Sequence, residues 1–301
     1  MQKYFSNGKL LLTGEYVVLD GALSLAVPTK YGQSLKVELT DEPKIIWTSL
    51  DEKRNVWFKG EFELEDGILK QVQHDEVSNR LIQILNEAKK LNSNFLNSNE
   101  GFKITTELDF PKNWGLGTSS TLINNIAQWA QVNAFKLLEN TFGGSGYDIA
   151  CAQYDKPISY QLKNNKPVVH ELDFNPSFKE HLYFVFLNKK QNSRDGIKHY
   201  NENKKDSNSE ISEISDITSK ISTCKTLNEF ENLITNHQKI ISKVIKQKPV
   251  KDLLFPDFNG SIKSLGAWGG DFVLVTSTTN PTNYFKEKGF KTIVSYEKII
   301  L

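Results

Sequence analysis

The chain has 301 residues, 38% of them hydrophobic, and its 37 Lys and Arg residues nearly balance its 36 Asp and Glu residues. A formal net charge of +1 gives no overall attraction to nucleic acid or to an anionic membrane, so we expect neither as a partner. No stretch reaches the roughly 18 apolar residues of a membrane span, and the N-terminus lacks a signal cleavage site. We therefore expect a cytoplasmic protein in which Cys151 and Cys224 are reduced thiols, with a single disulfide as the alternative.

The first third of the chain predicts mainly strands. Residues 9–39 alternate apolar and polar side chains and are rich in β-branched residues, a pattern typical of strands joined by turns. The spacing of apolar residues predicts a helix over 77–91, and the polar stretch 92–100 indicates a surface loop. Shorter strands are predicted from the same alternation at 45–49, 56–58, 62–64 and 102–108.

Helices and strands are interleaved in the rest of the chain. Hydroxyl residues able to cap a helix open the pattern over 118–135. The polar region 189–213 indicates a solvated loop and the start of a helix. The other expected elements are helices at 134–139, 214–230, 230–245 and after Pro281, a helix turn with a strand at 149–161, and strands at 182–187, 271–276 and 291–295.

This order of elements favours one fold class. Strands come first and helices follow without regular βαβ repetition, which indicates an α+β fold rather than a doubly wound sheet. The length is too great for one small core and suits two domains. We place them at 1–170 and 171–301.

A glycine-rich loop before a helix is the most informative segment, PKNWGLGTSS at 111–120. Gly115 and Gly117 free the backbone just before the helix, whose first N–H groups are unpaired and lie at the positive end of its dipole. Such a site suits polyphosphate, and the hydroxyls of Thr118, Ser119 and Ser120 could bind phosphate oxygens or Mg²⁺. The segment fits neither a Walker loop nor a dinucleotide fingerprint, and a flexible turn with a serine cap remains the alternative.

This loop resembles the PxxxGLGSS phosphate loop of the GHMP kinases. The matching residues are Pro111, Gly115, Leu116, Gly117, Thr118 and Ser119, with Thr118 in place of the usual first serine. The N-terminal segment NGKLLLTGEY resembles the first motif of that superfamily through Lys9 and the GEY of phosphomevalonate kinases. Without the resemblance, Lys9 would be an exposed lysine at the end of a strand.

Two later segments also resemble GHMP motifs. GGSGYD resembles the segment that carries the catalytic aspartate of mevalonate and phosphomevalonate kinases, through Ser145, Gly146 and Asp148. Alternatively, Asp148 caps the helix that begins at residue 149. The segment IKSLGAWGGD resembles the third motif, and the matching residues are Lys263, Gly266, Ala267, Gly269, Gly270 and Asp271.

The resemblance implies a fold, two bound species and a set of roles. The fold is a ribosomal-protein-like N-terminal domain with a left-handed βαβ unit, followed by a ferredoxin-like C-terminal domain. ATP lies on residues 115–120, Asp148 orients or deprotonates the acceptor, and Lys9 pairs with Asp148. Gly266, Ala267, Gly269 and Gly270 close over the reacting groups. Mg²⁺ is held by Ser119 and by Glu139, for which a solvated helix-end glutamate is the alternative.

The sequence also departs from the superfamily pattern in the third motif, at Leu265 and Trp268, and in the spacing between two motifs. Trp268 stands where the third motif has glycine, which is expected to narrow the space beside the phosphates. Ser119 and Asp148 are also closer in sequence than the superfamily leads us to expect. These departures leave a non-catalytic ATP or metabolite sensor open as an alternative.

The acceptor is expected to be a small anionic metabolite. Lys189, Lys190, Ser193 and Arg194 could bind its charge, because guanidinium donates two hydrogen bonds at once to phosphate; a solvated basic run is the alternative. Glu15, Ser145 and Gly146 are further candidate substrate contacts. We favour a phosphomevalonate kinase-like activity in isoprenoid precursor synthesis, with mevalonate kinase as the alternative, and the oligomeric state stays open between monomer and homodimer.

Overall fold

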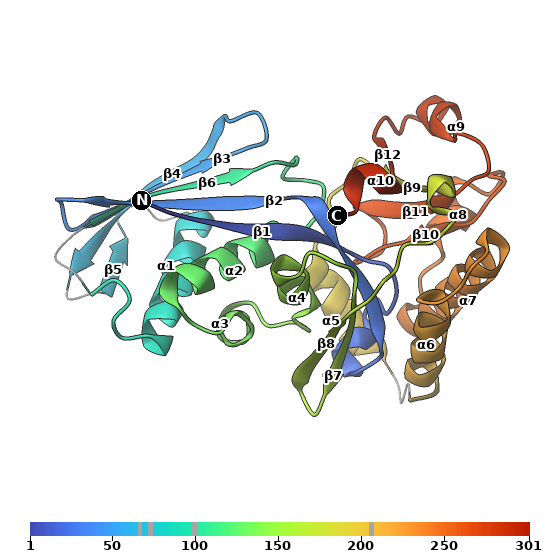
Figure 1. Ribbon diagram of the computed structural model, residues 1–301, viewed down its shortest axis with the longest axis horizontal. Helices are drawn as coiled ribbons and strands as arrows, with labels where there is room; N and C mark the ends of the chain where they lie inside the picture. The colour runs from blue at the N-terminus through green and yellow to red at the C-terminus, as the bar shows by residue number, and fades with distance from the viewer. Residues whose placement is uncertain (66–67, 72–74, 98–100, 205–207) are drawn as a thin grey trace. The chain divides into compact units, whose positions relative to one another are not determined.

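The computed structural model of the chain describes residues 1–65, 68–71, 75–97, 101–204 and 208–301 (Figure 1). Its contacts form two units that interleave along the chain. Unit 1 comprises Met1–Gly8, Tyr31–Lys112 and Leu116–Gln153, and unit 2 comprises Lys9–Lys30, Asn113–Gly115 and Tyr154–Leu301. The sequence-based domains 1–170 and 171–301 divide the chain differently, and that division stays a prediction.

Unit 1 contains a sheet with the strand order β5-β4-β3-β6-β2, and β1 pairs with β2. The strands are β1 (Gln2–Leu11), β2 (Ser24–Thr40), β3 (Lys44–Leu50), β4 (Val56–Glu65), β5 (Ile68–Gln71) and β6 (Gly101–Leu108). Most neighbours are antiparallel, but β3 and β6 pair in parallel. A parallel pair needs a crossover connection, and here the crossover includes a helix, α1.

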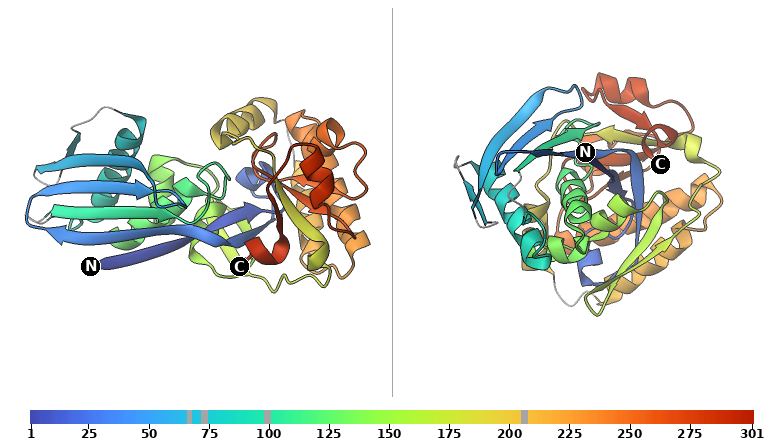
Figure 2. Two further views of the ribbon diagram at one scale, coloured as in Figure 1. Left: turned by 90° about the horizontal axis from the view of Figure 1, so that it is seen from above. Right: turned by 60° about the vertical axis from the view of Figure 1, so that its left-hand side comes forward.

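Helices cover one face of this sheet. They lie below the blue and green strands in Figure 1 and behind those strands in the left view of Figure 2. They are α1 (Glu76–Leu91), α2 (Thr118–Ala130), α3 (Ala134–Thr141) and α4 (Tyr147–Gln153). Trp47 and Ile104 of the sheet pack with Leu85 of α1 and Ile126 of α2, all fully buried. The apolar faces of strands and helices therefore share one core in unit 1.

Unit 2 contains the start of β2, which pairs with β7 (Ile158–Lys163), and β8 (Lys166–Glu171), which pairs with β7. A second sheet has the order β10-β11-β9-β12 with antiparallel neighbours. Its strands are β9 (Leu182–Phe186), β10 (Ile262–Ser264), β11 (Phe272–Thr276) and β12 (Ile293–Ser295). With β9 and β11 in the centre, this is the order of a ferredoxin-like β-α-β-β-α-β unit, as the resemblance implied.

The helices of unit 2 pack in two groups. They are η1 (Val17–Asp20), η2 (Lys179–His181), α5 (Ser193–Asn203), α6 (Asn208–Ile221), α7 (Leu227–Ile245), α8 (Val250–Leu254), α9 (Thr282–Glu287) and α10 (Tyr296–Ile299). One core joins the second sheet to Phe255, which follows α8, and to Phe285 of α9. Another joins the η1 region to α5, α6 and α7 through Tyr200, Ile214 and Ile241. Across the described ranges, no helix is long and apolar enough to cross a membrane.

Several predicted boundaries were wrong for local physical reasons. The strands predicted at 56–58 and 62–64 are one strand, β4, because Gly60 interrupts the apolar pattern but still pairs with Trp47. The helix predicted over 118–135 ends at Ala130, because Gln131 turns left-handed with φ 55°. Within 189–213 the structure has a helix, α5. Only Gly196 and Tyr200 of this helix are buried, so the sequence has no repeating apolar pattern there that would predict it.

Other differences concern the limits of the predicted segments. Residues 98–100 of the predicted loop and 205–207 of the polar region lie outside the described residues. The first strand begins at Gln2 rather than at residue 9. The sequence reading missed short elements that lack a full period of apolar residues, namely β5, β8, α8, β10 and α10.

Candidate active site

The glycine-rich loop leads into α2 through left-handed glycines. Gly115 has φ 72° and Gly117 has φ 96°, a region that only glycine adopts readily. Gly117 is the N-cap of α2, and no side chain caps the helix there. The predicted serine cap is therefore wrong, and the first N–H groups of α2 are not occupied by a capping side chain. This is the backbone arrangement that suits an anion.

The hydroxyl residues of the loop have different surroundings. Ser120 is buried and donates to the Gly117 carbonyl over 2.8 Å, and Thr121 donates to the same oxygen over 3.1 Å. Ser119 is exposed and Thr118 is half-buried. The Ser120 hydroxyl thus bonds within the loop, and the phosphate contacts expected of Thr118, Ser119 and Ser120 stay predictions.

Lys9 reaches the loop from β1. Its Nζ donates a hydrogen bond to the Gly115 carbonyl over 3.0 Å, and the side chain is half-buried, unlike an exposed lysine at the end of a strand. The bond places an ammonium group at the start of the glycine-rich loop. Asp148 belongs to the other unit, so the expected Lys9–Asp148 pair stays a prediction.

Asp271 lies against the same glycine. A Cβ at Gly115 would lie 2.4 Å from Asp271 Cγ, so only glycine allows this approach. Asp271 Oδ1 accepts from the Gln191 N–H over 3.0 Å, and its own N–H donates to the Lys189 carbonyl over 2.7 Å. Asp271 matches the third motif, but the sequence predicted no role for it. The signal was present, since this Asp ends the motif.

Electrostatics also link Asp271 to the loop. Burial raises the pKa of the Asp271 carboxyl above its ordinary value, and the Gln191 N–H and the positive charges of Lys9 and Lys190 oppose that rise. A carboxyl group, two lysines and a glycine carbonyl are therefore gathered within unit 2.

Asp148 lies in the first turn of α4. Its Oδ1 accepts from the Ile149 N–H over 3.1 Å, but α4 begins at Tyr147, so Asp148 is not the capping residue before a helix that starts at 149. Gly146 before it has φ 86°, and Ser145 and Gly146 are buried while Asp148 is half-buried. The catalytic role expected of Asp148 stays a prediction.

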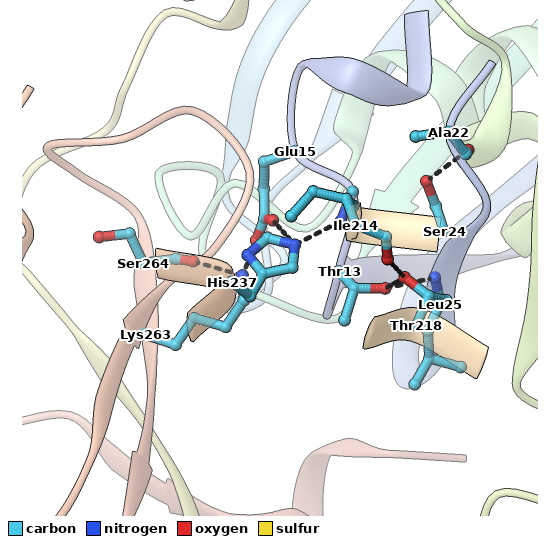
Figure 3. Close-up of polar contacts among 11 residues, drawn as sticks. Thr13, Glu15, Ala22, Ser24, Leu25, Ile214, Thr218, His237, Lys263 and Ser264 are labelled. Carbon is cyan, nitrogen blue, oxygen red and sulfur yellow. Dashed lines mark hydrogen bonds and ion pairs between the residues drawn. The ribbon is translucent and has the colours of Figure 1, made fainter. Parts of the chain in front are cut away.

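Glu15, expected to contact substrate, is fully buried instead (Figure 3). Its Oε1 accepts a short hydrogen bond from Lys263 Nζ, and its Oε2 lies 3.3 Å from His237 Nε2. Burial raises the pKa of Glu15 and lowers the pKa of Lys263, and the attraction between the two opposite charges opposes both shifts. Burial also lowers the pKa of His237. A substrate contact at Glu15 does not fit this burial. No sequence motif distinguished His237.

Trp268 is also buried rather than beside the phosphates. Its side chain is 3% exposed and packs with Tyr16, Tyr200 and Ile241 in the core that joins η1 to the helices. The expectation that Trp268 narrows the phosphate space is therefore wrong. The indole turns into the core, because Gly266 and Gly269 on either side adopt positive φ and let the loop fold over it.

The remaining candidates are on the surface. Lys189, Ser193 and Arg194 are exposed around the start of α5. Glu139 is exposed and forms an ion pair with Lys136 over 2.8 Å, which fits the solvated helix-end alternative. The described ranges contain no group of three or more His, Cys, Asp or Glu side chains that could hold a metal.

Solved structures resemble this chain over nearly its whole length. The Streptococcus pneumoniae phosphomevalonate kinase in complex with phosphomevalonate and AMPPNP matches with a TM-score of 0.72 and 14% identity, covering 98% of this chain and 100% of that chain. The Methanococcus jannaschii mevalonate kinase matches with a TM-score of 0.69 and 17% identity over 98% of each chain. The Lactococcus lactis galactokinase complexed with galactose matches with a TM-score of 0.64 and 14% identity, covering 95% and 88%.

These three proteins are GHMP kinases. No protein-family model and no curated protein sequence matches the chain. At 14–17% identity the likeness concerns the fold. The sequence-based expectation of an α+β fold is confirmed: the chain has the two-domain fold of the GHMP kinases.

Proposed function

We propose that the chain is an ATP-dependent kinase of a small anionic metabolite, with phosphomevalonate as the favoured acceptor. The observation that carries the proposal is the group at Gly115, where the Lys9 ammonium and the Asp271 carboxyl meet the loop that opens α2. Phosphoryl transfer requires mainly positioning and neutralisation of charge, which is what such a group supplies. The fold shared with kinases supports the same conclusion.

The nucleotide would lie on the start of α2. Its β- and γ-phosphates would accept hydrogen bonds from the uncapped N–H groups after Gly117 and from the Thr118 and Ser119 hydroxyls. The Lys9 ammonium at the Gly115 carbonyl adds positive charge to the same loop. The phosphomevalonate kinase with this fold was solved with AMPPNP, an ATP analogue, which supports a nucleotide here.

Mg²⁺ would accompany the nucleotide, and the residues present fit one protein ligand. Mg²⁺ commonly keeps several waters and takes phosphate oxygens, so the exposed Ser119 hydroxyl would be one contact among several. Bound there, the ion would neutralise charge that develops on the phosphates. Glu139 fits poorly, because its exposed carboxylate already pairs with Lys136.

The acceptor oxygen would attack the γ-phosphorus while the bond to the bridging oxygen breaks and ADP leaves. Asp148 would orient the acceptor or, for a hydroxyl, take its proton. Lys9 would stabilise the charge that builds up on the transferred group. The third-motif loop (Gly266–Gly270) would close over the reacting groups.

The acceptor class follows from the basic side chains at the start of α5. Lys189 and Arg194 are exposed, and Lys189 is fixed beside the site because its carbonyl accepts from the Asp271 N–H. A phosphorylated acceptor gives these charges a partner. Mevalonate is the second candidate acceptor, because a mevalonate kinase resembles the chain with a TM-score of 0.69 over 98% of its length, against 0.72 for the phosphomevalonate kinase.

The test measures ADP release with Mg-ATP and, in turn, phosphomevalonate, mevalonate, homoserine and galactose. We expect the rate of ADP release with phosphomevalonate to exceed the rates with the other three acceptors. Tight Mg-ATP binding without turnover on any acceptor would instead indicate a metabolite sensor.

Asp148→Asn should lower kcat by about 100-fold or more, as expected for a positioned acid or base, and leave Mg-ATP binding nearly unchanged. Asp173→Asn is the control for the same chemical change, because Asp173 is exposed at a position to which we assign no catalytic role. An Asp148→Asn rate within a few-fold of the parent would exclude the role assigned to this aspartate.

A further inference from the structure

Four consecutive residues that follow β1 each bond to a later segment of unit 2. We call Thr13, Gly14, Glu15 and Tyr16 the β1 turn. Thr13 Oγ1 accepts from the Thr218 hydroxyl of α6 over 2.8 Å (Figure 3). The Gly14 N–H donates to His237 Nε2 of α7 over 2.9 Å. The turn is therefore fixed to both long helices of this unit.

His237 must be neutral to accept the hydrogen bond from the Gly14 N–H. Nε2 accepts the Gly14 N–H, so this nitrogen carries no proton and Nδ1 carries the single ring proton. Burial holds the pKa of His237 well below its ordinary value, in agreement with the neutral form. The imidazole serves as a fixed acceptor that sets the position of the Gly14 backbone.

The next residue of the turn bonds to the strand that leads into the third motif. Glu15 Oε1 accepts from Lys263 Nζ, which also donates to the Ser264 carbonyl over 3.1 Å. Both charged side chains are fully buried. Lys263 lies in β10, only three residues before Gly266, so this pair fixes the start of the third-motif loop.

Tyr16 bonds to the loop itself. Its hydroxyl accepts from the Trp268 N–H over 3.0 Å, and its ring stacks on Tyr200 at 5.7 Å between centroids. Tyr16 has φ 66°, which is unusual for a bulky side chain and persists only where the surroundings impose it. The strained backbone directs the hydroxyl to the loop.

Two glycines of the loop border open space. A Cβ at Gly266 or Gly269 would meet nothing within 4 Å, and both glycines have positive φ. We propose that the β1 turn is a positioning element that holds the third-motif loop in one conformation relative to Lys9 on the preceding strand. His237, Tyr16 and the Glu15–Lys263 pair are its positioning residues. That the held loop serves phosphoryl transfer rests on the proposed function.

Tyr16→Phe is the first test, because it removes one hydroxyl and keeps the buried ring. We expect amide hydrogen exchange in the third-motif loop, at Gly266, Gly269 and Gly270, to become at least five-fold faster. We also expect kcat to fall at least five-fold at saturating Mg-ATP, with a lower melting temperature but a protein that is folded at the assay temperature, because the buried Trp268 N–H loses its acceptor. Tyr200→Phe is the matched control, since its hydroxyl bonds to Asp20 rather than to the loop.

The exchange measurement does not depend on turnover, so it separates this proposal from the proposed function. Faster loop exchange in Tyr16→Phe with an inactive parent would keep the positioning element and reject the kinase. Loop exchange equal to that of Tyr200→Phe would reject the positioning element, whatever the activity.

His237 and the ion pair supply a second test with conservative replacements. His237→Gln keeps a side-chain acceptor for the Gly14 N–H and should keep loop exchange within two-fold of the parent, whereas His237→Phe should raise it. Glu15→Gln with Lys263→Met removes both buried charges together, which avoids leaving one unpaired. We expect this folded double variant to show faster loop exchange and slower turnover. Parent-like values for both quantities in the double variant would contradict the role of the pair.

Discussion

At the residue scale, Asp271 shows how one carboxyl group can be constrained from several sides. Its backbone is left-handed with φ 52°, its Oδ1 accepts the Gln191 N–H, and its carboxyl group lies where a Cβ of Gly115 would be. Each constraint comes from a different segment of unit 2. Holding a residue in this way costs stability. A substitution that relieves the constraint therefore measures that cost.

Asp271→Asn should stabilise the protein at neutral pH and less so in acid. Burial raises the folded-state pKa of Asp271 above 3.8, so its contribution to stability is present below 3.8 and is lost as pH rises through the folded pKa. Asparagine keeps the acceptor for Gln191 and tolerates positive φ. Urea unfolding of both proteins at pH 4 and pH 7 checks this. A variant-minus-parent difference that is equal at the two pH values would contradict the assigned burial.

At the element scale, helix ends are set by single residues with left-handed backbone. Lys246 ends α7 with φ 53°, and its N–H bonds to the Ser242 and Lys243 carbonyls. Gln131 ends α2 in the same way with φ 55°. Glycine is the common residue at such positions. Because Lys246 and Gln131 stand there instead, the sequence gives no signal for where these two helices end.

Lys246→Gly should raise the free energy of unfolding by about 1 kcal/mol, because glycine adopts positive φ without the steric cost of a Cβ. Lys246 is exposed, so few other contacts change. Lys243→Gly is the control within the same helix, where glycine should lower stability by about 1 kcal/mol. Chemical denaturation measures both. Equal losses for the two variants would show that the cap conformation does not limit α7.

At the scale of the whole molecule, nucleotide binding should appear as added stability. A single site at a ligand concentration 100 times its Kd adds about 2.7 kcal/mol to unfolding. We expect Mg-ATP to raise the melting temperature and AMP, which lacks the β- and γ-phosphates, to have little effect. Gly115→Ala should abolish the Mg-ATP shift, because its Cβ would lie 2.4 Å from Asp271 Cγ. An equal shift with AMP would place binding away from the phosphate loop.

The sequence by itself determined the features that depend on neighbours in the chain. Alternating and helical periodicity predicted the α+β class and most long elements, such as α1 and α7, because each pattern reflects which side chains of one element face the core. Gly115 and Gly117 before a helix predicted the loop conformation, because only glycine adopts it readily.

Only the tertiary structure decided which distant residues meet. Glu15 and Lys263 are 248 positions apart, and Tyr16 and Trp268 are 252 apart, so no local pattern could show that a suspected substrate ligand is a buried ion pair or that Trp268 turns into the core. His237 carried no motif, because a lone histidine gains its role from the Gly14 N–H that the fold brings to it. Local sequence fixes which conformations a segment can adopt, whereas burial and hydrogen-bond partners depend on packing between segments.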